Sequence, residues 1–268
     1  MKTVLAIAGS DSSGGAGLQC DVKTVSSLGL HAQTVVTSVT SQTNEEVCSL
    51  DHVAPLSVQR QLTSTFNNHQ VNAVKSGMIP TAESVFKVST ALQEFHDSKP
   101  YVLDPVFKST SGTTLIMDAA AQAMLECLFP LATLVTPNVS EAEKLSGIKI
   151  LSPEDAVRAG RKLLEHACRY VLIKGGHLIE SPGLDILVGP NVDTPPEFVC
   201  GFEFAENRNV HGTGCAYATA ISCGLASDLD VVQAVHAAKH YITRAILNAT
   251  QLANGSWILN HKLAGSHS

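Results

Sequence analysis

The stretch "TVLAIAGSDSSGGAG", residues 3–17, joins an apolar run to a loop of glycines and small polar residues. The apolar run predicts a buried strand. The residues after the loop place Leu18, Val22, Val25 and Leu28 at helical spacing, which predicts an amphipathic helix. A strand, a short polar loop and a helix in this order are the repeating unit of a sheet that helices cover.

The same order recurs along the chain. Short apolar runs end in polar or glycine-rich residues at "NAVKSG" (72–77), "YVLDP" (101–105), "ATLVT" (132–136) and "YVLI" (170–173), and helix-like segments lie between them. The alternation predicts an α/β fold with a mainly parallel sheet covered on both faces. Ligands of such sheets bind at the carboxyl ends of the strands, where each of these polar clusters falls.

Two regions break the alternation. Residues 32–55 predict two strands around a polar turn, and residues 185–204 predict an antiparallel pair interrupted by prolines. We expect both to be additions to the parallel sheet, the first of them a small β flap. The chain shows no repeat, linker or low-complexity tract, so we expect a single domain over residues 1–268.

Composition narrows the class of protein. The formal net charge is −6, only 16% of residues are charged and no basic block occurs, which argues against nucleic acid or a membrane surface as a partner. No apolar run approaches the ~18 residues of a membrane span. The first apolar run is too short for a signal peptide. Seven scattered cysteines without a CxxC pair predict reduced thiols and a cytoplasmic location.

The glycine-rich loop at residues 9–17 suggests a phosphate site at a helix start. It fits neither the Walker pattern, because Gly15 and Ala16 follow Gly14, nor GxGxxG. Two interpretations remain open: a tight strand-to-helix turn, or close backbone approach to a small ligand with Asp21 one turn into the helix.

"VTPNVSEAE" (135–143) places Asn138 and Glu141 three residues apart at a predicted helix start, so both face the same way. An amide beside a carboxylate suits hydrated Mg²⁺. A helix N-cap with a capping-box glutamate explains the same pair. Lys174, at the end of an apolar strand in "LIKGGH", suits a phosphate contact or a lysine that snorkels before a turn.

"HGTGC" (211–215) precedes a run of small and apolar residues that predicts a buried helix. Free N–H groups of residues 212–215 and the helix dipole would form an anion site and lower the pKa of Cys215. A thiolate there could accept a proton from an attacking hydroxyl group. A small buried cysteine that starts a core helix is the alternative.

Taken together and in order, several motifs resemble the hydroxymethylpyrimidine/phosphomethylpyrimidine kinases of thiamine synthesis, within the ribokinase-like superfamily. The resembling motifs are "IAGSDSSGGAGLQCDVKT", "VKSGM", "VLDPV", "VTPNVSEA", "IKGGH" and "HGTGC". The resemblance implies a three-layer α/β/α sandwich around a mainly parallel sheet. It also implies that ATP and Mg²⁺ serve to phosphorylate 4-amino-5-hydroxymethyl-2-methylpyrimidine and then its monophosphate.

The resemblance assigns roles to single residues. Cys215 resembles the catalytic base, and Gly212, Thr213 and Gly214 resemble the anion hole. Asn138 and Glu141 resemble the magnesium-phosphate pair, and Lys174, Thr213 and Lys239 resemble nucleotide contacts. The positions that would line the pyrimidine pocket are Gly9, Asp21, Gln42, Met78 and Val106.

Other functions stay open at this point. A pyridoxine or pyridoxal kinase of the same lineage shares nearly every motif, and Gln42, whose amide matches the edge of an aminopyrimidine, favours the pyrimidine. Glu46, Phe107 and the pair Ala216–Tyr217 depart from the family's usual residues. A catalytically inactive ligand-binding relative is a further alternative. A nicotinamide-dependent oxidoreductase lacks its GxGxxG motif here. We expect a homodimer, paired through the flap.

Overall fold

The computed structural model describes residues 1–43, 46–68, 70–95, 99–108, 112–176, 183–190, 195–199 and 210–265. Nine strands form the main sheet in the order β3-β2-β1-β4-β5-β6-β7-β8-β9. Their bounds are β1 Thr3–Asp11, β2 His31–Gln42, β3 Val47–His52, β4 Ala73–Ser76, β5 Tyr101–Leu103, β6 Leu134–Val135, β7 Val171–Ile173, β8 Asp185–Val188 and β9 Glu197–Val199. A second sheet, in the order β10-β12-β11, holds Val210–His211, Trp257–Ile258 and Thr250–Gln251.

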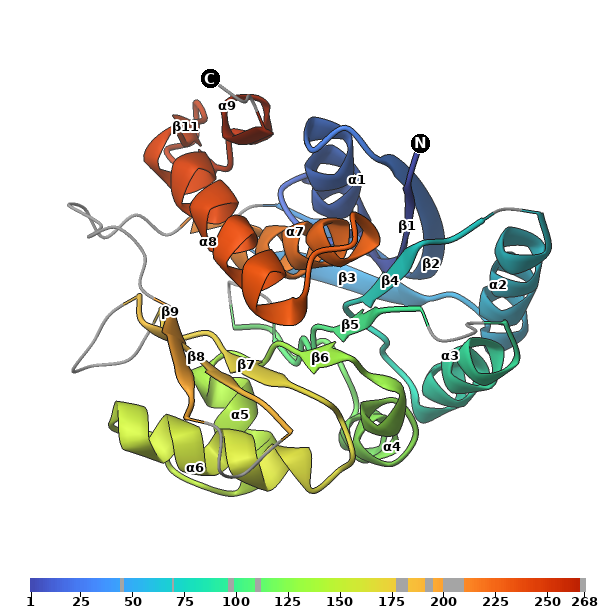
Figure 1. Ribbon diagram of the computed structural model, residues 1–268. Coiled ribbons are helices and arrows are strands. Elements are labelled where there is room, and N and C mark those ends of the chain that lie inside the picture. The colour runs from blue at the N-terminus through green and yellow to red at the C-terminus, as the bar shows by residue number, and fades with distance from the viewer. Residues whose placement is uncertain are drawn as a thin grey trace.

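Helices cover both faces of the main sheet (Figure 1). Helices α2 (Pro55–Asn68), α3 (Ala82–Phe95), α4 (Asp118–Cys127), α5 (Val139–Ser146) and α6 (Pro153–Leu164) pack on one face. Helices α1 (Gly17–Ser27), α7 (Thr213–Ala226) and α8 (Val231–Leu247) pack on the other, and α9 (His261–Gly265) lies against α1 and α8. The predicted three-layer α/β/α sandwich is confirmed.

Alternation along the central strands fills both cores. In β5, Tyr101 and Leu103 join the core under α2–α6, whereas Val102 joins the core under α7 and α8. Successive side chains of a strand point to opposite faces, so a strand covered on both sides must be apolar throughout. This is why the buried strands read as continuous apolar runs in the sequence.

The parallel core of the sheet runs from β2 to β7, because β2-β1-β4-β5-β6-β7 pair in parallel. β3 pairs antiparallel with β2, and β8 and β9 add an antiparallel edge. The prediction that both strands of residues 32–55 are additions is wrong for β2, which pairs with β1 along the whole of β1. Residues 191–194 and 200–204 of the second predicted addition lie outside the described residues.

The buried face of α1 also differs from the predicted one. Val22 is 39% exposed, whereas Asp21 and Thr24 are fully buried. The difference has a physical cause, because Asp21 accepts two hydrogen bonds from the buried Lys75 at 3.0 Å each. The ion pair with Lys75 on β4 therefore orients α1 so that Asp21 faces the sheet and Val22, which the apolar spacing placed on the buried face, is partly exposed.

Candidate active site

The carboxyl edge of the parallel strands gathers the polar side chains, as the sequence predicts. Asp11 ends β1, Asp104 directly follows β5 and Lys174 directly follows β7. The pairing continues beyond the strands, because the Lys174 N–H donates to the Pro137 carbonyl at 2.9 Å and Asn138 forms a bridge with Lys174. Asp104, Asn138 and Lys174 therefore stand side by side at this edge.

The start of α7 closes the site. Gly212 caps the helix with a φ of 85°, and a Cβ there would lie 1.9 Å from the Gly15 carbonyl oxygen, so this position requires glycine. Thr213 Oγ1 donates to the Val210 carbonyl at 2.8 Å, which fixes the turn. The N–H groups of the first helical turn have no intrahelical partner and carry the positive end of the helix dipole. Residues 212–215 therefore present the free N–H groups that the predicted anion site requires.

Cys215 is the third residue of α7 and is half-buried. The Gly17 N–H donates to its sulfur. The prediction of a lowered pKa is wrong for the ligand-free protein, because burial raises the pKa of the Cys215 thiol to about 11. Lys75 and the Gly17 N–H oppose the rise, and the nearby carboxylates of Asp21 and Asp104 add to it. Desolvation of the thiolate therefore outweighs the favourable field of the helix start.

Lys174 links the strand edge to α7. Its Nζ donates to Asp104 Oδ1 at 2.6 Å, and a Cβ on Gly214 would lie 3.3 Å from Nζ. Burial lowers the pKa of Lys174, but Asp104 and Glu141 outweigh it and the net shift is upward. A charged ammonium group therefore stands against the turn at the start of α7, where a lysine is suited to bind a phosphate.

Asn138 and Glu141 form a capping box at the start of α5. Asn138 Oδ1 accepts from the Glu141 N–H at 2.9 Å, and the Asn138 N–H donates to Glu141 Oε2 at 2.8 Å. The capping interpretation of this pair is thus correct. Burial raises the pKa of Glu141 to about 7, with Lys174 opposing the rise and Asp104 adding to it. The cap therefore holds a carboxyl group that titrates near neutrality beside Lys174.

Asp104 is a candidate site residue that sequence reasoning missed. It is fully buried; its Oδ1 accepts from Lys174 and from Thr136 Oγ1, whereas its Oδ2 has no hydrogen-bond partner within the described residues. An unsatisfied carboxylate oxygen buried beside Glu141 fits an oxygen-liganded cation such as Mg²⁺. The described residues hold no group of three or more His, Cys, Asp or Glu suited to a metal, so water and phosphate would complete such a shell. An aspartate directly after a buried strand was the available signal.

Four of the expected pocket residues lie along this edge, in β1 and β2 and just after β4 and β5. A Cβ on Gly9 would lie 2.7 Å from Ser38 Oγ and 3.2 Å from Met78 Sδ, so glycine keeps this contact close. Met78 is buried, whereas Gln42, at the end of β2, and Val106, after β5, are half-buried. Gln42 and Val106 are thus accessible to a ligand.

Asp21 does not join them. Its carboxylate is fully buried, accepts from Lys75 Nζ and accepts from Thr219 Oγ1 at 2.6 Å. In this structure it faces these two partners and not open space, contrary to the prediction of a pocket residue. Its position below α7 makes it a neighbour of Cys215, whose pKa it raises.

Lys239 likewise differs from the predicted nucleotide contact. Its Nζ is buried, donates to the Gly183 carbonyl at 2.8 Å and pairs with Asp185 at 2.7 Å. Asp185 also accepts from the Gly175 N–H. Lys239 thus holds the start of β8, and Gly183 and Asp185 in turn form hydrogen bonds with Gly175, the residue that follows Lys174.

The glycine-rich loop after β1 already contains an anion. Asp11 accepts hydrogen bonds from the N–H groups of Ser13 and Ala16 at 2.8 and 2.7 Å, and from Ser13 Oγ at 2.9 Å. The carboxylate occupies the donors that a phosphate would need. The loop is therefore a tight turn closed by Asp11 and no phosphate site, and close approach of its backbone to a small ligand stays a prediction.

The structure shows what surrounds the three departures from the family pattern. Phe107 is buried in the core and its N–H donates to Glu141. Ala216 is fully buried, and the Tyr217 ring lies 5.8 Å from Lys239 Nζ. The Glu46 N–H donates to Thr43 Oγ1 in the turn between β2 and β3.

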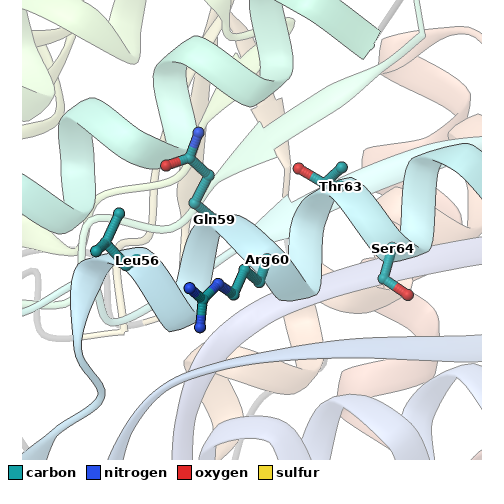
Figure 2. A pocket seen from close by; sticks show the side chains of 5 residues that line it. All are labelled: Leu56, Gln59, Arg60, Thr63 and Ser64. Carbon is teal, nitrogen blue, oxygen red and sulfur yellow. The ribbon is translucent and has the colours of Figure 1, made fainter.

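A surface hollow on α2 is separate from this site. Figure 2 shows its lining side chains projecting from that one helix. They are Leu56, Gln59, Arg60, Thr63 and Ser64. None of them belongs to the strand ends or to the start of α7.

A three-layer fold with a helix start, a lysine and two carboxylates at one sheet edge defines the class of ribokinase-like small-molecule kinases. The chain belongs to the phosphomethylpyrimidine kinase family, whose sequence pattern matches residues 11–260. It is 38% identical to the hydroxymethylpyrimidine/phosphomethylpyrimidine kinase of Rhizobium meliloti, over 94% of this chain and 92% of that one. It is 39% identical to the thiamine biosynthesis bifunctional protein ThiED of Geobacter sulfurreducens, of which it spans about half, 52%.

Solved structures agree with this assignment. Phosphomethylpyrimidine kinase from Clostridium difficile is similar with a TM-score of 0.80 and 35% identity, covering 92% of this chain and 100% of that one. An ADP complex of Bacillus subtilis pyridoxal kinase is similar with a TM-score of 0.87 and 30% identity, covering 98% of each chain. Pyridoxal kinases are thus structural relatives. Within the described residues, no helix is long and apolar enough to cross a membrane.

Proposed function

We propose that this protein transfers the γ-phosphoryl group of ATP to the hydroxymethyl group of 4-amino-5-hydroxymethyl-2-methylpyrimidine, and then to the resulting monophosphate, in thiamine biosynthesis. In the first step the oxygen–phosphorus bond to the alcohol forms, the bond from the γ-phosphorus to ADP breaks, and the alcohol proton passes to the thiolate of Cys215. Because the thiol is protonated in the ligand-free protein, this thiolate first has to form by release of the thiol proton to water. The names of relatives that span nearly the whole chain support this activity.

The observation that carries the proposal is the convergence of three groups. Cys215 and the free N–H groups of the α7 start lie at the carboxyl edge, and Lys174 Nζ lies against Gly214 of the same turn. The turn and the lysine would bind the transferred phosphoryl group, and the thiol would stand beside the attacking hydroxyl group. Phosphoryl transfer needs positioning and charge stabilisation of this kind.

ATP and Mg²⁺ complete the proposed reaction. An ADP complex of a relative supports use of the nucleotide. Asp104 and Glu141 would hold the cation, directly or through water and phosphate, with Asn138 fixing Glu141 by the capping box. When bound, Mg²⁺ would neutralise the charge of the transferring phosphates. Lys174 is tied to Asp104 and would bring its charge to the same phosphates.

Phosphorylation of pyridoxal or pyridoxine is the second candidate function, because pyridoxal kinases share the fold at a TM-score of 0.87. Gln42 favours the pyrimidine. Its amide offers a donor and an acceptor side by side, and a 4-aminopyrimidine presents an amino donor next to a ring-nitrogen acceptor. Pyridoxine lacks that pair.

The test of this choice is Gln42→Met, which keeps the side-chain length and removes both hydrogen bonds. We expect the variant to lose about 1–3 kcal/mol of transition-state stabilisation for the pyrimidine alcohol, and less for pyridoxine. The measurement is kcat/KM for both substrates with Mg-ATP. An equal loss for the two substrates would remove the reason for choosing the pyrimidine.

We further propose a cytoplasmic homodimer. All six cysteines that the structure describes are free thiols, which supports a reducing compartment. β3 is the end strand of the main sheet and has only β2 beside it among the described strands, which supports pairing of its other edge with a second subunit. Light scattering would measure the molar mass, and a monomer at micromolar concentration would contradict the dimer.

A further inference from the structure

Three side chains from separate segments meet beside the proposed pyrimidine site. Gln42 ends β2, Asp11 ends β1, and His211 directly precedes the turn into α7. His211 Nε2 lies 3.0 Å from Asp11 Oδ2 and 3.2 Å from the Gln42 amide nitrogen. The side chains of Asp11 and His211 are each 5% exposed, so solvent does not compete for these contacts.

The proton between Asp11 and His211 lies on His211. Asp11 already accepts from two N–H groups and from a hydroxyl group. These donors and His211 outweigh burial and lower the pKa of Asp11 to about 2. An ionised carboxylate only accepts hydrogen bonds, so His211 Nε2 must donate, whether the ring is neutral or charged.

A nitrogen that donates its proton to Asp11 has no lone pair for an amide N–H. The Gln42 amide can nevertheless contact His211 when its oxygen faces Nε2, because the single N–H of that nitrogen can be shared between Asp11 Oδ2 and the amide oxygen. The oxygen and nitrogen of an amide exchange places by a half-turn. The second polar atom of the Gln42 amide lies 3.3 Å from Thr40 Oγ1. After the half-turn this atom is the amide nitrogen, which faces the Thr40 hydroxyl group. Thr40 Oγ1 donates to the Ser10 carbonyl at 3.0 Å and so can accept from the amide.

The remaining hydrogen-bonding capacity of Gln42 follows by counting. An amide has two N–H groups and two oxygen lone pairs. Thr40 takes one N–H and His211 takes one lone pair, which leaves one donor and one acceptor in a fixed order. The reverse orientation of the amide would present the same groups in the opposite order.

We infer that Asp11 and His211 are positioning residues that fix the Gln42 amide, and so determine which order of donor and acceptor on a heteroaromatic ring the site accepts. The inference rests on the proposed function, in which Gln42 binds the ring edge of the aminopyrimidine. Neither residue touches the transferred phosphoryl group, and both act through Gln42.

A double-mutant cycle tests this coupling. Binding of the pyrimidine alcohol without ATP is measured by calorimetry for the wild type, His211→Phe, Gln42→Met and the double variant. His211→Phe removes the N–H and keeps a planar ring, so we expect a roughly 5–50-fold weaker Kd. In the Gln42→Met background, the same change should alter Kd by less than about twofold, because the group through which His211 acts is gone. Pyridoxine binding should respond less to either change.

The controls separate this inference from the proposed function and from misfolding. His52→Phe makes the same change at an exposed position of β3 and should leave Kd unchanged. The nitrogen-15 shifts of His211 in the wild type should show a protonated Nε2. Full additivity of the two changes, or an unprotonated Nε2, would overturn the inference. If Gln42→Met alone left Kd unchanged, the pyrimidine assignment would fail first.

Discussion

At the scale of single residues, the pKa of Cys215 differs most between the prediction from sequence and the structure. A cysteine at a helix start suggests a lowered pKa, yet burial, with Asp21 and Asp104 adding to it, raises the pKa of the thiol to about 11. The sequence did not reveal how close the two carboxylates lie, because they come from α1 and from the end of β5. Only the folded chain brings them to one place.

The raised pKa predicts the pH dependence of Cys215 alkylation. Below pH 11 the thiolate fraction falls about tenfold per pH unit, so iodoacetamide labelling of the ligand-free protein should rise about tenfold per unit between pH 7 and 10. Mass spectrometry of the peptide that contains Cys215 gives the rate, and the Cys215→Ser variant identifies the peptide. A plateau below pH 9 would mean that the helix dipole prevails over burial.

The proposed role of the thiol as a base predicts the order of activity of two variants. Cys215→Ser keeps a small hydrogen-bonding group but loses the accessible thiolate, so kcat should fall by roughly 10²–10⁴-fold with little change in the KM for ATP. Cys215→Asp restores a base and should retain more activity than the serine variant. Steady-state kinetics with Mg-ATP decide this, and a fully active serine variant would return Cys215 to a packing role.

At the scale of elements, α5 combines structure and proposed function. Its capping box fixes Glu141, and the same carboxyl group lies beside Lys174 and Asp104. The capping and metal interpretations of the sequence are therefore compatible, because the cap uses Glu141 Oε2 and leaves the group close to the cation site that Asp104 suggests.

Glu141→Gln separates the two roles. The pKa of Glu141 is raised in the folded state from 4.5 to about 7, so its folded form binds more protons than its unfolded form between these values. Stability from this group is therefore lost as the pH rises from 4.5 to 7. We therefore compare the melting temperatures of Glu141→Gln and the wild type without Mg²⁺. The melting temperature of the variant minus that of the wild type should increase by a few degrees between pH 5 and 8, because 1 kcal/mol shifts the midpoint by about 2–4 °C at this size.

The same variant should lower turnover and raise the Mg²⁺ concentration needed for half-maximal rate. Asp118→Asn, an exposed change at the start of α4, is the matched control, because it also removes one carboxylate. Wild-type rates together with an earlier melting transition at every pH would leave Glu141 with the capping role alone.

How much of each element the sequence predicted depends on what its residues contact. The buried strands were predicted well, since both of their faces meet apolar cores and the runs are continuous. The face of α1 was not, because Asp21 finds a lysine on β4, 54 positions away in sequence. Asp104 and His211 stood inside quoted motifs, but only the fold shows that one has an unsatisfied oxygen and the other faces Gln42.

At the scale of the whole molecule, the proposed acceptor side and the proposed nucleotide side of the site are built from different parts of the fold. Loop 12–16, Gln42 and His211 hold the proposed acceptor side, where Ser12 Oγ also donates to the Gln42 carbonyl at 2.9 Å. Lys174, Asp104 and α5 hold the proposed nucleotide side. The start of α7 lies between them and approaches both, through Gly15 on one side and Lys174 on the other. We propose that all 268 residues form one domain around this site.

The central claim is that this edge of the sheet phosphorylates an aminopyrimidine alcohol. The most direct test incubates the purified protein and Mg-ATP with the pyrimidine alcohol, its monophosphate, pyridoxine and pyridoxal in separate reactions, and follows the products by phosphorus-31 NMR. The account predicts a monophosphate from the pyrimidine alcohol and a diphosphate from the monophosphate, both at higher kcat/KM than any product of the two pyridines. ATP turnover on pyridoxal alone, or no phosphorylated product from any of the four, would contradict it.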